Sequence, residues 1–278
     1  MRNGCAAIAG CVVLVVATLQ GQSSPTAFEV ASVKVNRSGA VGTRIAAPRG
    51  TGRLDVTNAM VYTLILNAYG LQDFQLAGGP AWISNARFDI AARAASTATR
   101  EDISTALRAL LVDRFHLVVH REPREMPTYA LTLARPDGRL GPQLKPSTTD
   151  CIAVTANRGS GPPPTSTAGQ TLCGTTMTPS LLNAGNLSMA RLATTLSGMV
   201  GRMVSDETGL AGVYDLQLTF TPENAGRFPG PGAGPEPVDP NAPSIFAALV
   251  EQLGLKLDAR RGSVEVLVID RVEMPAED

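Results

Sequence analysis

The sequence predicts an α+β protein in which a helix-plus-β-hairpin unit recurs four times and the hairpins form antiparallel sheets packed by helices. Four segments carry apolar residues at helical spacing, and each is followed by a segment whose apolar residues alternate. A helix with one hairpin buries too little apolar surface to be stable alone, so the hairpins are expected to share sheets. Two long irregular stretches divide the units into pairs, which indicates two similar lobes or one longer sheet built from both.

The four predicted helices are defined by apolar faces and by residues suited to the position before a helix. A side-chain oxygen at that position accepts a hydrogen bond from a free backbone N–H, which favours Ser, Thr, Asp and Asn. The candidates are Thr57 or Asn58, Thr99 (with Asp102, resembling a capping box), Ser188 and Ser244. The apolar faces consist of Val61, Leu64, Ile65 and Ala68; Ile103, Ala106, Leu107, Leu110 and Leu111; Leu192, Leu196 and Met199; and Ile245, Ala248, Leu249 and Leu253.

Each helix is followed by a predicted hairpin whose second strand has alternating apolar residues, as expected for a sheet with one buried face. In the second unit the predicted turn covers residues 122–127, because Pro123 and Pro127 cannot donate to a sheet ladder. In the fourth unit the predicted turn is formed by Arg261 and Gly262. The alternating residues are Phe88 and Ile90; Tyr129, Leu131 and Leu133; Tyr214, Leu216 and Leu218; and Val264, Val266 and Val268.

Residues 1–24 are predicted to be a signal peptide, because Arg2 precedes an apolar run from Ala6 to Leu19 and small and polar residues follow it. The run is shorter than the ~20 apolar residues that span a bilayer, so no membrane span is expected after cleavage. An uncleaved anchor and lipid attachment at Cys11 are the alternatives. The expected location is periplasmic or extracellular.

The mature chain is divided into an N-terminal lobe (25–134), a disulfide-bearing loop (135–185) and a C-terminal lobe (186–278) with a Gly- and Pro-rich linker over 223–243. Cys151 and Cys173 are the two cysteines after the signal peptide, and in an exported protein such a pair most simply forms a disulfide. A redox pair or a metal site is disfavoured, because the pair lacks CxxC spacing and a nearby His.

The composition argues against several classes of partner. Lys and Arg together number 24, as do Asp and Glu, so the chain has no basic excess with which to bind nucleic acid. Aromatic residues make up only 4%, with Trp82 as the single tryptophan, which argues against stacking platforms for sugars or bases.

Residues with catalytic or metal-binding chemistry do not form a recognisable motif. His116 and His120 lie four apart on a predicted strand, which separates them by about 13 Å and suits surface positions better than one metal ion. Asp206 and Glu207 are adjacent to a predicted turn, and neighbouring strand residues point to opposite faces. We therefore expect no enzymatic activity, no cofactor and no metal.

Several runs of the chain resemble an uncharacterised exported family that is expanded in soil bacteria. These are Phe28 to Lys34, Gly78 to Trp82, Leu110 to Leu117, Thr208 to Asp215, Leu253 to Leu257 and Val266 to Asp270. The resemblance covers nearly the whole mature chain and implies export and a helix-and-hairpin repeat fold, without an assigned activity or functional residues. Some relatives are fused to membrane metallopeptidase-type sensors, which implies a sensing or regulatory context. The pattern is also similar to small periplasmic domains at the start of secretins and outer-membrane receptors, which bind partner proteins.

The candidate interaction site consists of Gly78, Gly79, Pro80 and Trp82. A lone Trp on a Gly–Pro loop can be an exposed anchor, although a ring that closes the edge of the core is the commoner arrangement. We expect a non-catalytic protein whose sheets or strand edges bind another protein or a component of the cell envelope. A sensory or regulatory module acting with a membrane peptidase is the alternative. A hydrolase that uses carboxylates alone is a third hypothesis, and it requires a deep pocket with two or more acids within ~10 Å.

Overall fold

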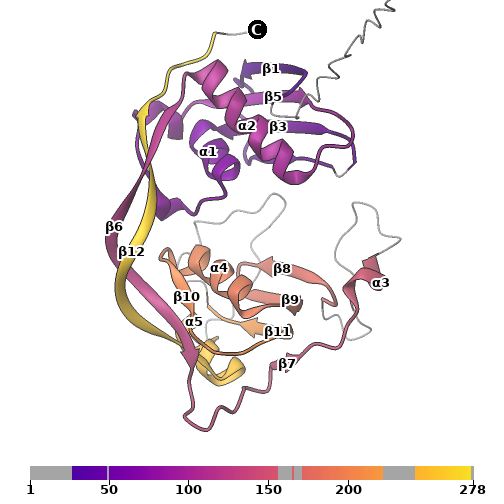
Figure 1. Cartoon of the computed structure of the whole chain (residues 1–278), viewed down its shortest axis with the longest axis vertical. Helices are drawn as coiled ribbons and strands as arrows, with labels where there is room; N and C mark the ends of the chain where they lie inside the picture. Colours follow the sequence, from indigo (N-terminus) through magenta and orange to yellow (C-terminus); the bar gives the residue numbers. More distant parts are fainter. Residues whose placement is uncertain (1–26, 49, 156–164, 166–170, 222–241, 277–278) are drawn as a thin grey trace, which may run out of the picture.

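Two lobes, each a four-stranded sheet with helices on one face, are joined by a long twisted ribbon of two strands (Figure 1). The computed structural model describes residues 27–48, 50–155, 165, 171–221 and 242–276. The predicted signal peptide and most of the predicted linker lie outside these ranges. The three sheets are mostly antiparallel, which confirms the predicted α+β class.

The N-terminal lobe runs from β1 to α2, and the C-terminal lobe runs from β7 to η3. The elements of the first half are β1 (Val30–Val35), β2 (Arg44–Ala46), β3 (Arg53–Met60), α1 (Val61–Tyr69), η1 (Asp73–Gln75), β4 (Leu76–Gly78), η2 (Ala81–Ser84), β5 (Arg87–Arg93), α2 (Arg100–Phe115) and β6 (Val118–Leu133). Those of the second half are β7 (Leu144–Pro146), α3 (Cys151–Thr155), β8 (Gly174–Thr178), β9 (Leu181–Leu187), α4 (Met189–Val200), β10 (Val204–Asp206), β11 (Tyr214–Thr219), α5 (Ile245–Ala248), η3 (Leu249–Leu253) and β12 (Leu255–Arg271).

The two halves of the chain repeat one plan. The upper sheet, in the N-terminal lobe, has the order β1-β5-β3-β2, and the lower sheet, in the C-terminal lobe, has the corresponding order β7-β11-β9-β8. In each half the third strand leads into a helix, α1 or α4, and the last helix leads into a long strand, β6 or β12. The repeating unit is therefore half of the described chain rather than a quarter of it.

The long strands are exchanged between the halves. β6 leaves the N-terminal lobe and ends in the C-terminal core, where Leu131 is fully buried. β12 runs the opposite way and brings Leu267 and Ile269 into the N-terminal core. The two strands pair with each other along their length, while β4 adds in parallel to β12 at one end of the ribbon and β10 adds in parallel to β6 at the other. Each core is thus completed by a strand from the other half.

The predicted turns at 122–127 and at Arg261 and Gly262 are wrong, because both segments continue as single strands. β6 and β12 keep one register from Leu255 opposite Leu133 to Ile269 opposite Val119. Pro123 and Pro127 fit into this ladder because they are four residues apart and present their nitrogens to the same side. Along that stretch the described residues add no further strand to β6, so no hydrogen bond is lost there.

The helix signals are mostly confirmed. Thr99 and Asp102 form the capping box of α2, and the side chains of Ser188 and Ser244 cap α4 and α5. Neither Thr57 nor Asn58 caps α1, since the residue before that helix is Met60.

Asn58 instead makes the bend that leads from strand to helix, and the second half repeats this device. Asn58 and Asn186 both have a left-handed backbone with φ 57°, which Asn tolerates better than most residues. The backbone N–H of Asn58 donates to Asp89 Oδ1 at 2.8 Å, and that of Asn186 donates to Asp215 Oδ1 at 2.9 Å. The side-chain amides donate to the loop after each half's first strand: Asn58 to the carbonyls of Ala40 and Gly42, and Asn186 to that of Thr149.

We predict that Asp89→Ala and Asp215→Ala each lower the free energy of unfolding by about 1–3 kcal/mol, because each removes the acceptor of a backbone N–H at a bend. The two losses should add, since the residues lie in different lobes. Urea unfolding followed by circular dichroism measures both. The control is Asp55→Ala, which removes only a surface ion pair with Arg53 and should cost under about 1 kcal/mol. A loss at Asp215 no larger than at Asp55 would contradict the prediction.

Candidate interaction surfaces

The predicted interaction site at Gly78, Gly79, Pro80 and Trp82 lies where β4 joins the ribbon. Trp82 is half-buried and packs edge-on against Phe88, with 6.5 Å between the ring centroids. A Cβ at Gly78 would lie 2.9 Å from the carbonyl oxygen of Ile269, so the close approach to β12 requires glycine there. The loop thus closes the edge of the N-terminal core. Gly78, Gly79 and Pro80 are exposed, whereas Trp82 is only partly exposed.

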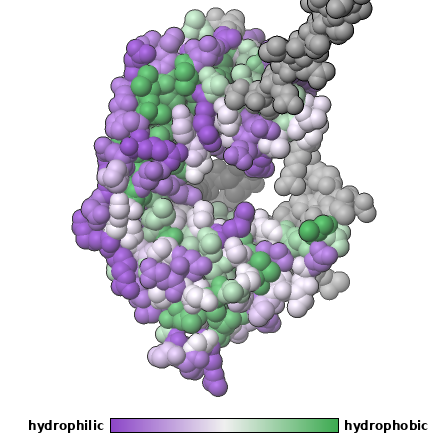
Figure 2. All heavy atoms as spheres, in the orientation of Figure 1, coloured by the Kyte–Doolittle hydropathy of each residue, from purple (hydrophilic) through white to green (hydrophobic). Residues whose placement is uncertain are grey.

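The prediction that both histidines lie on one strand is wrong, because His116 ends α2 in a left-handed backbone conformation and only His120 lies in β6. Each histidine faces acidic residues. His116 Nδ1 is 3.4 Å from Glu273 Oε2, and His120 Nδ1 is 2.9 Å from Asp270 Oδ1. The hydrogen bond to Asp270 raises the pKa of His120, and the Glu122 carboxylate adds to this effect. In the ranges that the structure describes, no three His, Cys, Asp or Glu side chains are placed to hold a metal ion. Figure 2 shows mainly hydrophilic residues along the left margin of the molecule, where Figure 1 places the ribbon of β6 and β12.

Asp206 and Glu207, the adjacent acids considered in the sequence, lie at the end of β10. Asp206 Oδ1 accepts hydrogen bonds from the backbone N–H and the hydroxyl of Thr208, at 3.0 and 2.8 Å. This is the turn-forming role that the Thr208–Gly209 sequence predicts.

Two shallow depressions lie together on the upper sheet. They have volumes of about 260 and 290 Å³ and occupy the face of the sheet that points away from α1 and α2. The depression of about 290 Å³ is lined by Asp55 and Asp89, but both depressions are open and neither is the deep pocket that the carboxylate-hydrolase hypothesis requires. The N- and C-terminal lobes also meet beside the ribbon, where a Cβ at Gly198 of α4 would lie 2.9 Å from Gln72 Oε1.

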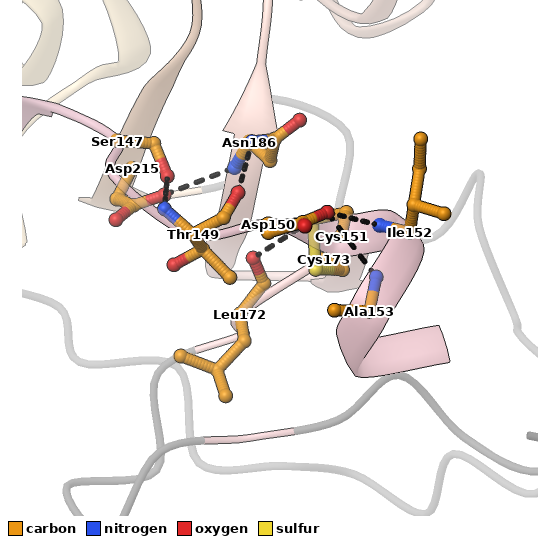
Figure 3. The surroundings of a disulfide bond; sticks show 10 residues. All are labelled: Ser147, Thr149, Asp150, Cys151, Ile152, Ala153, Leu172, Cys173, Asn186 and Asp215. Carbon is orange, nitrogen blue, oxygen red and sulfur yellow. Dashed lines mark hydrogen bonds between the residues drawn. A yellow bond between two sulfur atoms is a disulfide. The ribbon is translucent and has the colours of Figure 1, made fainter. Parts of the chain in front are cut away.

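The corresponding face of the lower sheet is covered by the disulfide-bearing segment. Cys151 and Cys173 are bonded, with 5.7 Å between their Cα atoms, which confirms the predicted disulfide (Figure 3). Asp150 caps the short helix α3 by accepting from the N–H groups of Ile152 and Ala153. Because the bond joins α3 to the residues before β8, it holds the two ends of the segment together.

The disulfide-bearing segment lies close to β9 because β9 has a glycine, Gly185, where the two meet. The N–H of Thr171 donates to Asn183 Oδ1 at 3.2 Å, and Thr171 is buried. A Cβ at Gly185 would lie 2.1 Å from the carbonyl oxygen of Thr171, so any larger residue would displace the segment. The two sheets therefore differ: among the described residues, this face is covered in the C-terminal lobe and open in the N-terminal lobe.

β8 forms an edge of the lower sheet and lies on the side toward the N-terminal lobe (Figure 1). Its first four residues are exposed, and Met177 keeps 52% of its surface accessible. This segment falls within the predicted disulfide-bearing loop (135–185), for which no such strand is predicted. The signal was the uncharged run Thr175, Thr176, Met177 and Thr178, which is rich in β-branched residues.

We predict that reduction of the disulfide destabilises the C-terminal lobe without unfolding the protein. Closing a loop with a sequence separation of 22 residues contributes about 3 kcal/mol in the chain-entropy model. Thermal melts with and without reductant should therefore differ, whereas a Cys151→Ser/Cys173→Ser variant should melt at the lower temperature under both conditions. Two free thiols in the mass spectrum of the unreduced protein would refute the pairing.

We predict that His120 stabilises the fold in acid and loses this effect in alkali. Since the pKa of His120 is raised in the folded state by Asp270 and Glu122, its contribution is complete below the unfolded value of about 6.5 and disappears as the pH rises through the folded value. The melting temperature of the wild type should exceed that of His120→Gln at about pH 5.5, and the gap should close near pH 9. A gap that does not change with pH would show that packing, not charge, explains it.

None of the helices in the described ranges has the length and apolar content that a membrane crossing needs. The disulfide is consistent with an oxidising location outside the cytoplasm. No curated protein and no solved structure matches the chain. The family model described as "Protein of unknown function (DUF3738)" matches residues 62–272, which is more than half of the chain, and the protein therefore belongs to the DUF3738 family.

Proposed function

We propose that this protein is an exported, non-catalytic module that binds another protein of the cell envelope by adding an extended segment of that partner to the edge of β8. Strand addition uses the free backbone N–H and C=O groups of an edge strand and gains specificity from side chains on either side. The observation that carries the proposal is the chemistry of β8 itself. It is an exposed edge without the features that normally prevent such pairing.

The other edges of the two lobe sheets carry such protective features. Proteins discourage strand addition with charged side chains, prolines or very short strands at their edges. β7 has Lys145 and Pro146, β2 is three residues long and begins with Arg44, and β1 carries Lys34. β8 has five residues, none of which is charged or a proline.

An apolar side chain lies beside the open edge of β8. Met177 is opposite Leu182 and Thr175 is opposite Ala184 in the pairing with β9, so these side chains share the face that is packed by helices. Leu182 and Ala184 belong to the C-terminal core, whereas Met177 is half-exposed at its margin. A strand added to β8 would cover Met177 and extend this core by one row.

The other face of β8 is polar. Thr176 Oγ1 is 3.1 Å from Thr171 Oγ1, so this face adjoins the disulfide-bearing segment. A bound strand would therefore present apolar side chains toward the helices and small polar ones toward Thr171. An alternating segment of this kind is the partner sequence that β8 is built to accept.

The test is capture of the partner from native envelopes with the tagged full chain and with Met177→Lys. Burial of one Met side chain contributes roughly 1.5–3 kcal/mol, so the variant should recover the partner at least about tenfold less well. The matched control is Met274→Lys, because Met274 is also 52% exposed but lies beyond β12; it should behave like the wild type. Equal recovery with Met177→Lys would refute binding at β8. A membrane peptidase as the recovered partner would identify a regulatory role.

A further inference from the structure

We propose that the open face of the upper sheet is a second docking surface, independent of β8, which binds an acidic, extended segment of a protein. The open face consists of every second residue of β1, β3 and β5 together with Arg44 of β2. The alternate residues, such as Val33 and Ile90, point into the N-terminal core. The side chains that the argument uses are Val30, Ser32, Lys34, Arg53, Ala91 and Arg93.

One end of the open face places two guanidinium groups side by side. Arg53 and Arg93 are directly opposite each other on β3 and β5, and Val30 is opposite Arg93 on β1. Like charges in this arrangement repel. Asp55 lies 3.0 Å from Arg53 and offsets one charge, but Arg93 has no ion-pair partner in the part of the chain that the structure describes. The depression of about 260 Å³ lies at this position, so an anionic group can reach both arginines.

The other end of the open face has two further exposed cations. Lys34 is opposite Asp89, and Arg44 is opposite Thr57. Asp89 Oδ1 accepts hydrogen bonds from the backbone N–H of Asn58 and the side-chain amide of Asn36. With Lys34, Arg44, Arg53, Arg93 and the partly buried Arg87 against Asp55 and Asp89, the face has a surplus of three positive charges (5 − 2), although the whole chain is neutral.

Small side chains lie between the two cationic ends. Ser32 and Ala91 are opposite each other in the middle of the face, so an extended chain can approach the sheet closely there. Val30 lies beside Arg93 at the first end of the face. Lys34 is four residues further along β1, which corresponds to about 13 Å of strand. An extended segment with acidic residues four positions apart matches this separation.

The lower sheet gives an internal precedent for a chain segment on this face. There, Thr171 to Cys173 lie across β9, and the N–H of Thr171 is bonded to Asn183. A protein segment suits the upper face better than a membrane does, because Val30 alone among the exposed large apolar side chains of the described residues belongs to it. Membrane-surface binding requires a larger apolar face.

The test uses a fluorescent extended peptide of about nine residues, with two glutamates four positions apart among serines and threonines. A second peptide carries glutamine at both positions. Each is titrated against the full chain, Arg93→Glu and Arg261→Glu by fluorescence anisotropy, with thermal melts to verify folding. Arg261 is an exposed arginine of the ribbon, so the two variants change the net charge equally.

The expected result is that the glutamate peptide binds the wild type and Arg261→Glu alike, that Arg93→Glu weakens binding about tenfold, and that raising the salt from ~0.05 to ~0.3 M also weakens it. The glutamine peptide should bind at least tenfold less tightly. Equal losses in both variants, equal binding of both peptides, or binding only to phosphatidylglycerol vesicles and not to the peptide would overturn the proposal.

Discussion

The exchange of the last strand between the two halves is the constraint on which the rest of the structure depends. β6 and β12 have 16 and 17 residues, so the ribbon is about 50 Å long and reaches from one core to the other. Leu131 at one end and Leu267 at the other are buried in the core of the opposite half. Because these strands are the final layer of each core, neither lobe is complete without the other half of the chain.

Within this shared plan the two lobes expose different surfaces. In the C-terminal lobe Gly185 and the disulfide allow a chain segment to cover the sheet face, which leaves the edge at β8 as the accessible backbone. In the N-terminal lobe the corresponding face is open and charged, while the corresponding edge, β2, is short. A duplicated architecture has thus produced one lobe with an accessible edge and one with an accessible face, which suits a protein that contacts two segments or two partners.

The parts of the fold that depend on local chemistry could be predicted from the sequence. The capping box at Thr99 and the serine caps at Ser188 and Ser244 involve residues three apart, and the apolar helix faces repeat every three or four. The strand pairing could not be predicted in this way. Pro123 and Gly262 are ordinary turn signals, and only the long pairing of β6 with β12 makes them strand residues. The left-handed bend at Asn58 was missed for the same reason, since its acceptor, Asp89, is 31 residues away.

The sequence predicts that strand edges are exposed, but it does not identify which strands form them. β8 lies within a stretch that the sequence predicts to be a long irregular loop. The Trp82 ring packs against Phe88, which is the commoner of the two arrangements that its sequence context allows. Charged residues such as Lys34 and Arg93 are far apart in the sequence. They lie on one face of the sheet because β1 is next to β5 in the strand order.

The exchanged ribbon also affects how the protein matures during synthesis. The first half of the chain emerges from the ribosome long before Leu267, Ile269 and Val272, which close its core, have been made. Until then the nascent lobe exposes the apolar surface that these residues cover. The contacts that finally cover it join residues distant in sequence, and such contacts form slowly. Completion of this first core is thereby deferred until β12 has been synthesised.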